Sequence, residues 1–394
     1  MMYRVSDTIP AVGLTFALLL SGCGPRVHPN QSGFVTKLGD DTLAVESFRL
    51  TDSGMEAQVA LRSPITTVQR YDLQLDEDGR LVAYTAEIRS GDAPPDADPR
   101  RREVAALKGD SLEITVTENG ETEVRVLPAG QDALPFIDMV HWPFELMLTR
   151  ARAAGADSTS QPLFTPRGSM EFAVADLAPD SMTVTHPFRG TMMVDVDPEG
   201  RLLRLDAAHT TRKLVVERVD DVDIEGVAAR FVQLEAEGRA FGPLSGRGET
   251  MATVDGAMIR VDFGRPSKRG REIWGALVPY GEVWRTGANR ATHVETDRPL
   301  RVGNVDVPAG TFTLYSIPEA DGGVLIINQQ TGQGGTTYDE DMDFGRVPMQ
   351  RSELSESVED FTIEIEDTPE GGAIHLIWDR SRFTVPFTVR SEAG

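Results

Sequence analysis

The 394-residue chain contains a single cysteine, only four lysines beside 35 arginines, and aromatic side chains at just 7% of its positions. One cysteine excludes an internal disulfide and a cysteine-rich metal cluster, because both need more than one thiol. The sequence also lacks a Gly-x-Ser-x-Gly elbow, a Walker phosphate-binding loop, a dinucleotide-binding glycine motif and a His-Glu-x-x-His sequence. The usual signatures of serine hydrolases, nucleotide-dependent enzymes and zinc peptidases are therefore missing, and the sequence predicts no cofactor and no metal site.

Basic residues are too few to suit a nucleic-acid partner. The 39 Lys and Arg residues are outnumbered by 62 Asp and Glu residues, which gives a formal net charge of -23. Binding to phosphates needs a basic footprint, which an acidic chain does not supply. The excess negative charge instead predicts a solvated, self-repelling surface that keeps the protein soluble.

The apolar segment near the N-terminus, Val12–Leu20, is too short to span a bilayer. It follows Arg4 and runs into Leu20-Ser-Gly-Cys23, an order typical of a signal peptide that ends in a bacterial lipobox. The sequence therefore predicts a signal peptide over residues 1–22 and a lipid on Cys23. The alternative is a cleaved signal that happens to end near a cysteine.

A lipid on Cys23 would make the membrane a partner and anchor the protein without a transmembrane helix. Gly24, rather than Asp, follows the cysteine. This favours the outer membrane, with the protein facing the periplasm. Residues 23–33 contain two prolines and two glycines beyond the cysteine and read as a tether between lipid and fold.

Residues 34–240 contain many short segments in which apolar and polar side chains alternate, such as Met55–Leu61 and Tyr71–Leu75. One helix is expected among them, with Pro143 in its first turn and its end near Gly155. Strands on both sides of one helix predict a curved antiparallel sheet or half-barrel packed over that helix. The concave face would suit either a bound lipid or a filled core.

A glycine-rich segment, Gly238–Gly248, marks the expected boundary with a second unit over residues 250–394. That unit contains several short apolar segments between Gly, Pro and Asp turns, including Ile259–Phe263 and Thr311–Tyr315. Such spacing predicts a β-sandwich. The fold class is therefore mainly β, with an N-terminal half-barrel and a C-terminal sandwich.

Blocks rich in glycine, proline and tryptophan stand out in the second unit. They are Gly264–Trp274, with the sequence GRPSKRGREIW, and Leu277–Asn289, with the sequence LVPYGEVWRTGAN, followed by Val307–Pro318 and Trp378–Phe387. Through these blocks the segment from about Asp262 to Val389 resembles the bacterial domain-of-unknown-function family 2911. The resemblance implies an exported bacterial β domain and assigns no activity.

The first two blocks place hydrogen-bond donors beside aromatic rings. Guanidinium groups suit bidentate capture of carboxylate or phosphate, and indole rings suit stacking. The sequence therefore predicts an anion- or sugar-binding rim formed by Arg265, Arg269, Trp274, Tyr280, Trp284, Arg285 and Asn289. The alternative is that the tryptophans fill the core while Arg285 and Asn289 satisfy loop carbonyls. Two departures from the family alter this rim: Arg290 stands where Glu is frequent, and Thr331–Thr337 is glycine-rich where an aromatic residue is common.

A catalytic role would rest on Asp262, Glu282 or His293 as acid or base. His293 and Glu295 share one face of an expected strand, but two ligands are too few for a metal site. His375 alternates with apolar neighbours, as a sheet residue does. We expect a lipid-anchored envelope protein that binds a small molecule, a glycan or another envelope protein without catalysis. The alternative is an envelope hydrolase that acts on glycan or ester substrates.

Overall fold

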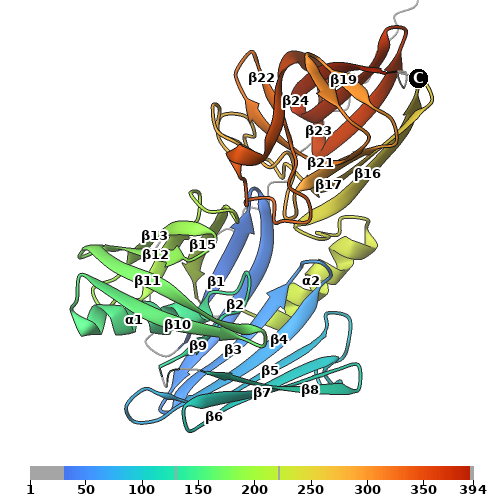
Figure 1. Cartoon of the computed structure of the whole chain (residues 1–394). Helices are drawn as coiled ribbons and strands as arrows, with labels where there is room; N and C mark the ends of the chain where they lie inside the picture. Colours follow the sequence, from blue (N-terminus) through green and yellow to red (C-terminus); the bar gives the residue numbers. More distant parts are fainter. Residues whose placement is uncertain (1–30, 129, 131, 221, 391–394) are drawn as a thin grey trace, which may run out of the picture.

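The computed structural model describes residues 31–128, 130, 132–220 and 222–390. These residues form two sheets, of 15 and nine strands, and two α-helices (Figure 1). The expected mainly β architecture is confirmed, with one α-helix more than predicted. The signal peptide and Cys23 lie outside the described residues. Neither α-helix in the described part of the chain has the length and apolar character needed to cross a membrane.

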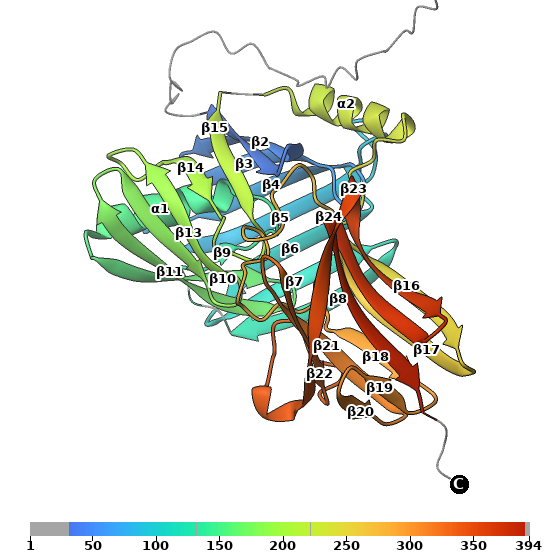
Figure 2. The ribbon, with the colours of Figure 1, turned by 90° about the horizontal axis from the view of Figure 1, so that it is seen from above.

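The larger sheet has the strand order β8-β7-β6-β5-β4-β3-β2-β1-β15-β14-β13-β12-β11-β10-β9. All neighbours are antiparallel except β9 and β10. The sheet curves, and its edge strands β8 and β9 do not pair with each other, so it is an open half-barrel (Figure 2). Its strands are β1 (Gln31–Leu38), β2 (Asp41–Thr51), β3 (Gly54–Leu61), β4 (Thr67–Leu75), β5 (Leu81–Ser90), β6 (Arg101–Lys108), β7 (Ser111–Glu118), β8 (Glu121–Pro128), β9 (Leu134–Pro135), β10 (Ser158–Thr165), β11 (Gly168–Ala178), β12 (Ser181–His186), β13 (Gly190–Val196), β14 (Leu202–Asp206) and β15 (Leu214–Val219).

The inner face of this sheet packs against helix α1 (Trp142–Ala154). Trp142 and Leu148 are fully buried in the resulting core. Pro143 lies in the first turn, where its missing N–H costs no hydrogen bond, and Gly155 ends the helix in the left-handed conformation at a φ of 63°. The predicted helix is therefore confirmed at both ends.

Helix α2 (Ile224–Ala236) was not predicted, and it packs on the opposite face of the sheet. The side chain of Asp223 caps its first turn. Ile224, Ala228 and Phe231 are its buried residues, and they pack against the sheet residues Val45, Ala60 and Val68. Val227 and Leu234 also pack against this cluster, so the apolar positions follow the i, i+3, i+4, i+7 spacing of an amphipathic helix, a signal in the sequence that the prediction overlooked.

The smaller sheet has the strand order β16-β17-β18-β21-β22-β23-β24-β19-β20. It folds over one core because β23 and β24 are long and change register, while β16 and β17 pack back against β23. The expected two-layered β unit is thus one sheet rolled on itself. Its strands are β16 (Ser245–Val254), β17 (Ala257–Pro266), β18 (Thr292–Thr296), β19 (Leu300–Val302), β20 (Val305–Val307), β21 (Gly310–Pro318), β22 (Gly322–Asn328), β23 (Asp343–Thr368) and β24 (Gly371–Val389); the short 3-10 helix η1 (Glu340–Met342) precedes β23.

Candidate functional site

A cleft of about 440 Å³ lies between the two sheets. The larger sheet contributes the turn between β12 and β13 and the loop between β14 and β15. The smaller sheet contributes the long connection between β17 and β18, which holds the Leu277–Asn289 block, together with residues that precede η1. The lining residues that matter below are Arg189, His209, Arg212, Lys213, Arg271, Glu282, Trp284, Arg285, Asn289, Gly335 and Trp378.

The lining is basic. Five cationic side chains contribute to it, whereas Glu282 is the one carboxylate that the described residues place there. Glu282 itself is exposed at the rim. In a chain with a net charge of -23, such a concentration of positive charge is a local exception. A concave basic site of this kind raises the local concentration of anions.

Most of these cations are already engaged by the protein. Arg189 lies 2.6 Å from Asp138, which also pairs with Arg212. Arg271 donates to two backbone carbonyls, and Lys213 donates to the carbonyl of Ala208 at 2.6 Å. Burial lowers the pKa of Arg212, Arg271 and Lys213 from their usual values. Burial therefore disfavours these positive charges, and a nearby anion would offset that cost.

Arg285 differs from the other cations of the cleft. Its Nε donates a long bond, 3.4 Å, to the carbonyl of Gly287, and no carboxylate of the described residues pairs with its guanidinium. Burial, with a smaller contribution from Arg212, lowers the pKa of Arg285. A half-buried guanidinium without a counter-ion is costly unless an anion can approach it.

The glycine-rich segment Thr331–Thr337 leaves room for Arg285. A Cβ on Gly335 would lie 2.6 Å from the Arg285 side chain and 2.8 Å from the carbonyl of Asn289. The backbone N–H of Gly335 donates to that carbonyl at 2.9 Å. Any larger residue at Gly335 would push the arginine out of its present position.

Two indole rings border the cleft. Trp284 and Trp378 are nearly parallel, with centroids 6.1 Å apart, and both contribute to the lining. Trp274 lies almost perpendicular to both and is 7% exposed, and its indole N–H donates to the carbonyl of Trp378 at 3.2 Å. Trp274 therefore packs in the core, whereas the half-buried Trp284 packs against the core and also lines the cleft.

Only some residues of the predicted rim lie in the cleft. Trp284, Arg285 and Asn289 meet in the cleft. Arg265 is exposed on β17, 3.9 Å from Asp360, outside the cleft lining. The remaining members also lie outside the lining: the Tyr280 hydroxyl accepts from Arg351 at 3.3 Å, Arg269 joins the two sheets, and Trp274 is in the core.

Sequence reasoning missed the half of the cleft that comes from the larger sheet. Arg189, Arg212 and Lys213 lie far from the Leu277–Asn289 block in the chain. The one available signal was the run Thr210-Thr-Arg-Lys213, which places one of only four lysines beside an arginine between two strands. Which blocks face each other depends on how the sheets pack, which the sequence pattern does not reveal.

The candidate catalytic residues do not converge. Asp262 pairs with Arg247 and lies opposite His293 on neighbouring strands, outside the cleft lining. The Nε2 atom of His293 accepts from the backbone N–H of Gly332 at 3.1 Å, and burial lowers its pKa. Glu282 stands apart from both, at the cleft rim. No cluster of three or more His, Cys, Asp or Glu side chains suited to a metal ion occurs in the described part of the chain.

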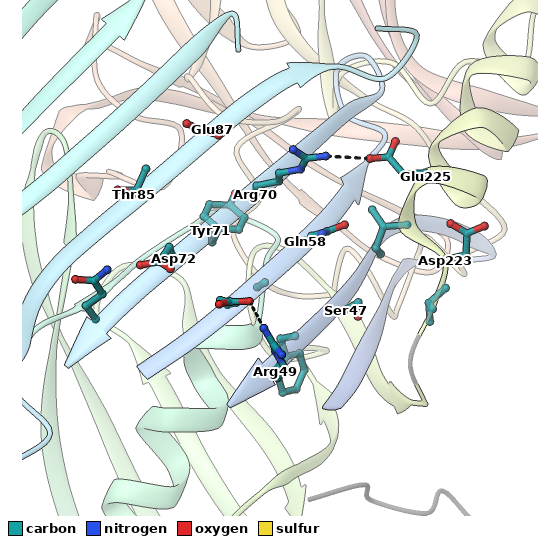
Figure 3. Close-up of a pocket in the computed structure, with 16 residues that line it drawn as sticks. Ser47, Arg49, Gln58, Arg70, Tyr71, Asp72, Thr85, Glu87, Asp223 and Glu225 are labelled. Carbon is teal, nitrogen blue, oxygen red and sulfur yellow. Dashed lines mark hydrogen bonds and ion pairs between the residues drawn. The ribbon is translucent and has the colours of Figure 1, made fainter. Parts of the chain in front are cut away.

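A second hollow, of about 790 Å³, lies on the outer face of β2–β5 beside the start of α2 (Figure 3). Both of its arginines are already paired: Arg49 lies 2.6 Å from Glu56, and Arg70 lies 3.6 Å from Glu225. The polar side chains are spread over several strands rather than aimed at one point. The cleft is therefore the stronger candidate for a binding site.

Comparison with known proteins agrees with the resemblance seen in the sequence. Residues 245–387 match the family described as "Protein of unknown function (DUF2911)". Among solved structures, a DUF1089 family protein from Pseudomonas aeruginosa is similar at 19% identity and a TM-score of 0.31, over 42% of this chain and 90% of that one. No match was found among curated proteins. The matched segment is thus similar to this family, whose description assigns no activity.

Proposed function

We propose that this protein binds a small ligand with a carboxylate or phosphate group in the cleft between its sheets. The observation that carries the proposal is Arg285, a half-buried guanidinium that has no carboxylate partner and that faces a basic cleft. The ligand's anion would supply the missing counter-charge. Fork-shaped hydrogen bonds from a guanidinium to such an anion are among the stronger polar interactions in proteins.

The neighbouring side chains fit the same role. Arg212 is close enough to Arg285 for their charges to interact, so an anion between them would relieve repulsion. Trp284 offers a flat apolar surface for the part of the ligand next to the anion. Glu282, as the only carboxylate of the described lining, would discriminate against ligands with further negative charge near the rim.

Binding is favoured over hydrolysis because the acids and bases named from the sequence are not assembled around the cleft. Asp262 is paired with Arg247, and His293 is engaged with the backbone of Gly332. A hydrolase that used the cleft would have to rely on Glu282 or His209, both exposed there. Neither is positioned by a second polar side chain in the hydrogen bonds of the described residues.

The proposal is tested by titrating the full-length protein with acetate and with inorganic phosphate in a calorimeter. We expect one of them to bind at one site, and Arg285→Gln to weaken that binding at least about tenfold, because a charge-assisted hydrogen bond is lost. Arg265→Gln is the matched control, since Arg265 belongs to the same family segment but lies outside the cleft. Equal affinities of the two variants would overturn the proposal.

We further propose that Cys23 is lipidated and that the protein is held at the outer membrane, facing the periplasm. The support is the sequence order of Arg4, an apolar segment and the Leu20-Ser-Gly-Cys23 lipobox. Cys23→Ser should move the protein from the membrane fraction to the soluble periplasmic fraction. A variant that remains in the membrane fraction would contradict the anchor.

A further inference from the structure

The basic cleft is the first of three hollows that share lining residues. It shares Arg189, Thr210 and Arg212 with a small hollow of about 30 Å³ inside the larger sheet. That hollow shares the segment 136–138 with a third one, of about 230 Å³. The three hollows therefore follow one another from the cleft into the half-barrel.

The polarity of the lining changes along this path. The cleft is basic, whereas the small hollow is lined mainly by apolar side chains, among them Phe144, Phe172, Met192, Leu205 and Leu214. The third hollow lies between β3–β6, β9 and β10, and its apolar lining includes Leu61, Ala86, Ile88, Phe136 and Phe164. Polar atoms in the third hollow are mostly satisfied within the protein: the Tyr71 hydroxyl donates to Gln69, and Glu103 pairs with Arg101 at 2.7 Å.

We propose that the ligand is a single-chain amphiphile: an anionic head bound in the cleft and a hydrocarbon tail that enters the half-barrel. This inference rests on the proposed anion-binding function and adds the class of ligand. An anion without a tail would leave the two inner hollows unused. A tail without an anion would leave Arg285 unpaired.

Asp138 stands at the junction between the cleft and the small hollow. Its carboxylate holds Arg189 and Arg212, and it belongs to the segment 136–138 that separates the two inner hollows. Phe136 and Ile137, next to it, are only half-buried. When the head group binds the arginines, it replaces Asp138, and the released segment widens the 30 Å³ neck for the tail.

The proposed tail is tested by the dependence of binding affinity on the length of the ligand's hydrocarbon chain. The probes are acetate, octanoate and uncharged 1-octanol, titrated into the full-length protein below their aggregation concentrations. Each methylene that becomes buried is expected to tighten binding about fourfold. Octanoate has six more methylenes than acetate, so burial of even three of them should make it bind at least about 50-fold more tightly. Uncharged 1-octanol should bind at least about tenfold more weakly than octanoate.

The possible results separate the two proposals. Octanoate that binds within about threefold of acetate would overturn the amphiphile while leaving the anion site intact. Binding of 1-octanol as tight as that of octanoate would overturn the role of the head group. If neither acetate nor phosphate nor octanoate binds, the anion site itself is wrong.

Two substitutions on β5 test whether the tail occupies the third hollow. Ala86 is 2% exposed and lines the third hollow, so Ala86→Leu fills the space that the tail would use. Ala83→Leu is the control, because Ala83 is an odd number of residues away on the same strand and faces the opposite side of the sheet. We expect Ala86→Leu to weaken octanoate at least about tenfold with acetate unchanged, and Ala83→Leu to alter neither. Unchanged octanoate binding in folded Ala86→Leu would contradict the path, and if this variant fails to fold, the chain-length series alone decides.

Discussion

The guanidinium of Arg269 lies 3.8 Å from the centroid of the Phe241 ring and donates to the Phe241 carbonyl at 2.9 Å. Its other terminal nitrogen lies 3.2 Å from Asp41 at the start of β2. The backbone carbonyl of Arg269 also accepts from the N–H of Asp40 at 3.2 Å. An arginine that the sequence places in a ligand-binding rim thus connects the smaller sheet to the larger one.

Replacing Arg269 should loosen this junction. We expect Arg269→Ala to lower the free energy of unfolding by about 2 kcal/mol, because a desolvated cation–π contact and several hydrogen bonds are lost together. Arg265→Ala, on the exposed face of β17, should change it by less than about 0.5 kcal/mol. Urea unfolding measures both. If both substitutions lowered the free energy of unfolding by the same small amount, the contacts of Arg269 would not stabilise the junction between the sheets.

The core of the half-barrel contains a buried ion pair between Glu145 of α1 and Arg218 of β15, each with a side chain 2% exposed. Glu145 also accepts from the backbone N–H of Leu202 at 3.0 Å. Glu145→Gln should destabilise the protein by about 3 kcal/mol or more, since it leaves a buried guanidinium unpaired. The exposed Arg49–Glu56 pair provides the control: Glu56→Gln should cost less than about 1 kcal/mol. A small effect of Glu145→Gln would show that water reaches Arg218.

His186, beside the cleft, should make the stability depend on pH. Burial, together with the charge of Arg189, lowers its pKa to about 4. The unfolded chain, with a histidine pKa near 6.5, therefore binds more protons than the folded one between these two values, and stability falls as the pH falls through this window. Between pH 7 and pH 5 we expect a loss of roughly 1 to 2 kcal/mol from this residue.

The matched variant for this prediction is His186→Asn. The Nδ1 atom of His186 accepts from the backbone N–H of Phe188 at 3.1 Å, and an asparagine oxygen can accept the same bond without titrating. Unfolding free energies at pH 7 and pH 5 should differ less in the variant than in the wild type. The same pH dependence in both would contradict a depressed pKa of His186.

Much of the fold could be predicted because it depends on local patterns. Alternating side chains identified most strands, and Pro143 and Gly155 marked both ends of α1. Helix α2 was missed although the apolar residues at positions 224, 227, 228, 231 and 234 follow the helical period. The strands β23 and β24 were not predicted at their full length, since their register changes interrupt the alternation that sequence patterns reveal.

The cleft could be predicted only in part. The block Leu277–Asn289, singled out for its aromatic and guanidinium groups, does contribute Trp284 and Arg285 to the lining of the cleft. Arg265 and Arg269 belong to the neighbouring block, yet they point to Asp360 and to Phe241. Proximity in sequence does not decide which side of a sheet or loop an arginine faces. The contribution of the larger sheet arises only from the packing of the two sheets.

Removing the internal counter-ion of the cleft should improve anion binding. Asp138→Asn keeps the size of the side chain and releases Arg189 and Arg212 from their shared carboxylate. We expect acetate or phosphate to bind at least about fivefold more tightly, because two charges that were neutralised become available. Glu56→Gln removes a negative charge far from the cleft and should leave the affinity unchanged. Weaker binding by folded Asp138→Asn would mean that Asp138 positions the arginines rather than competing for them.

The most direct test of the central claim is a crystal structure of the protein soaked in selenate, a tetrahedral anion whose position is revealed by anomalous scattering. The account predicts a peak in the cleft, with selenate oxygens at hydrogen-bond distance, about 2.7–3.2 Å, from the guanidinium of Arg285. The peak should disappear in Arg285→Gln crystals and persist in Arg265→Gln crystals. A cleft that stays empty at millimolar selenate, or a peak that survives in Arg285→Gln, would contradict the account.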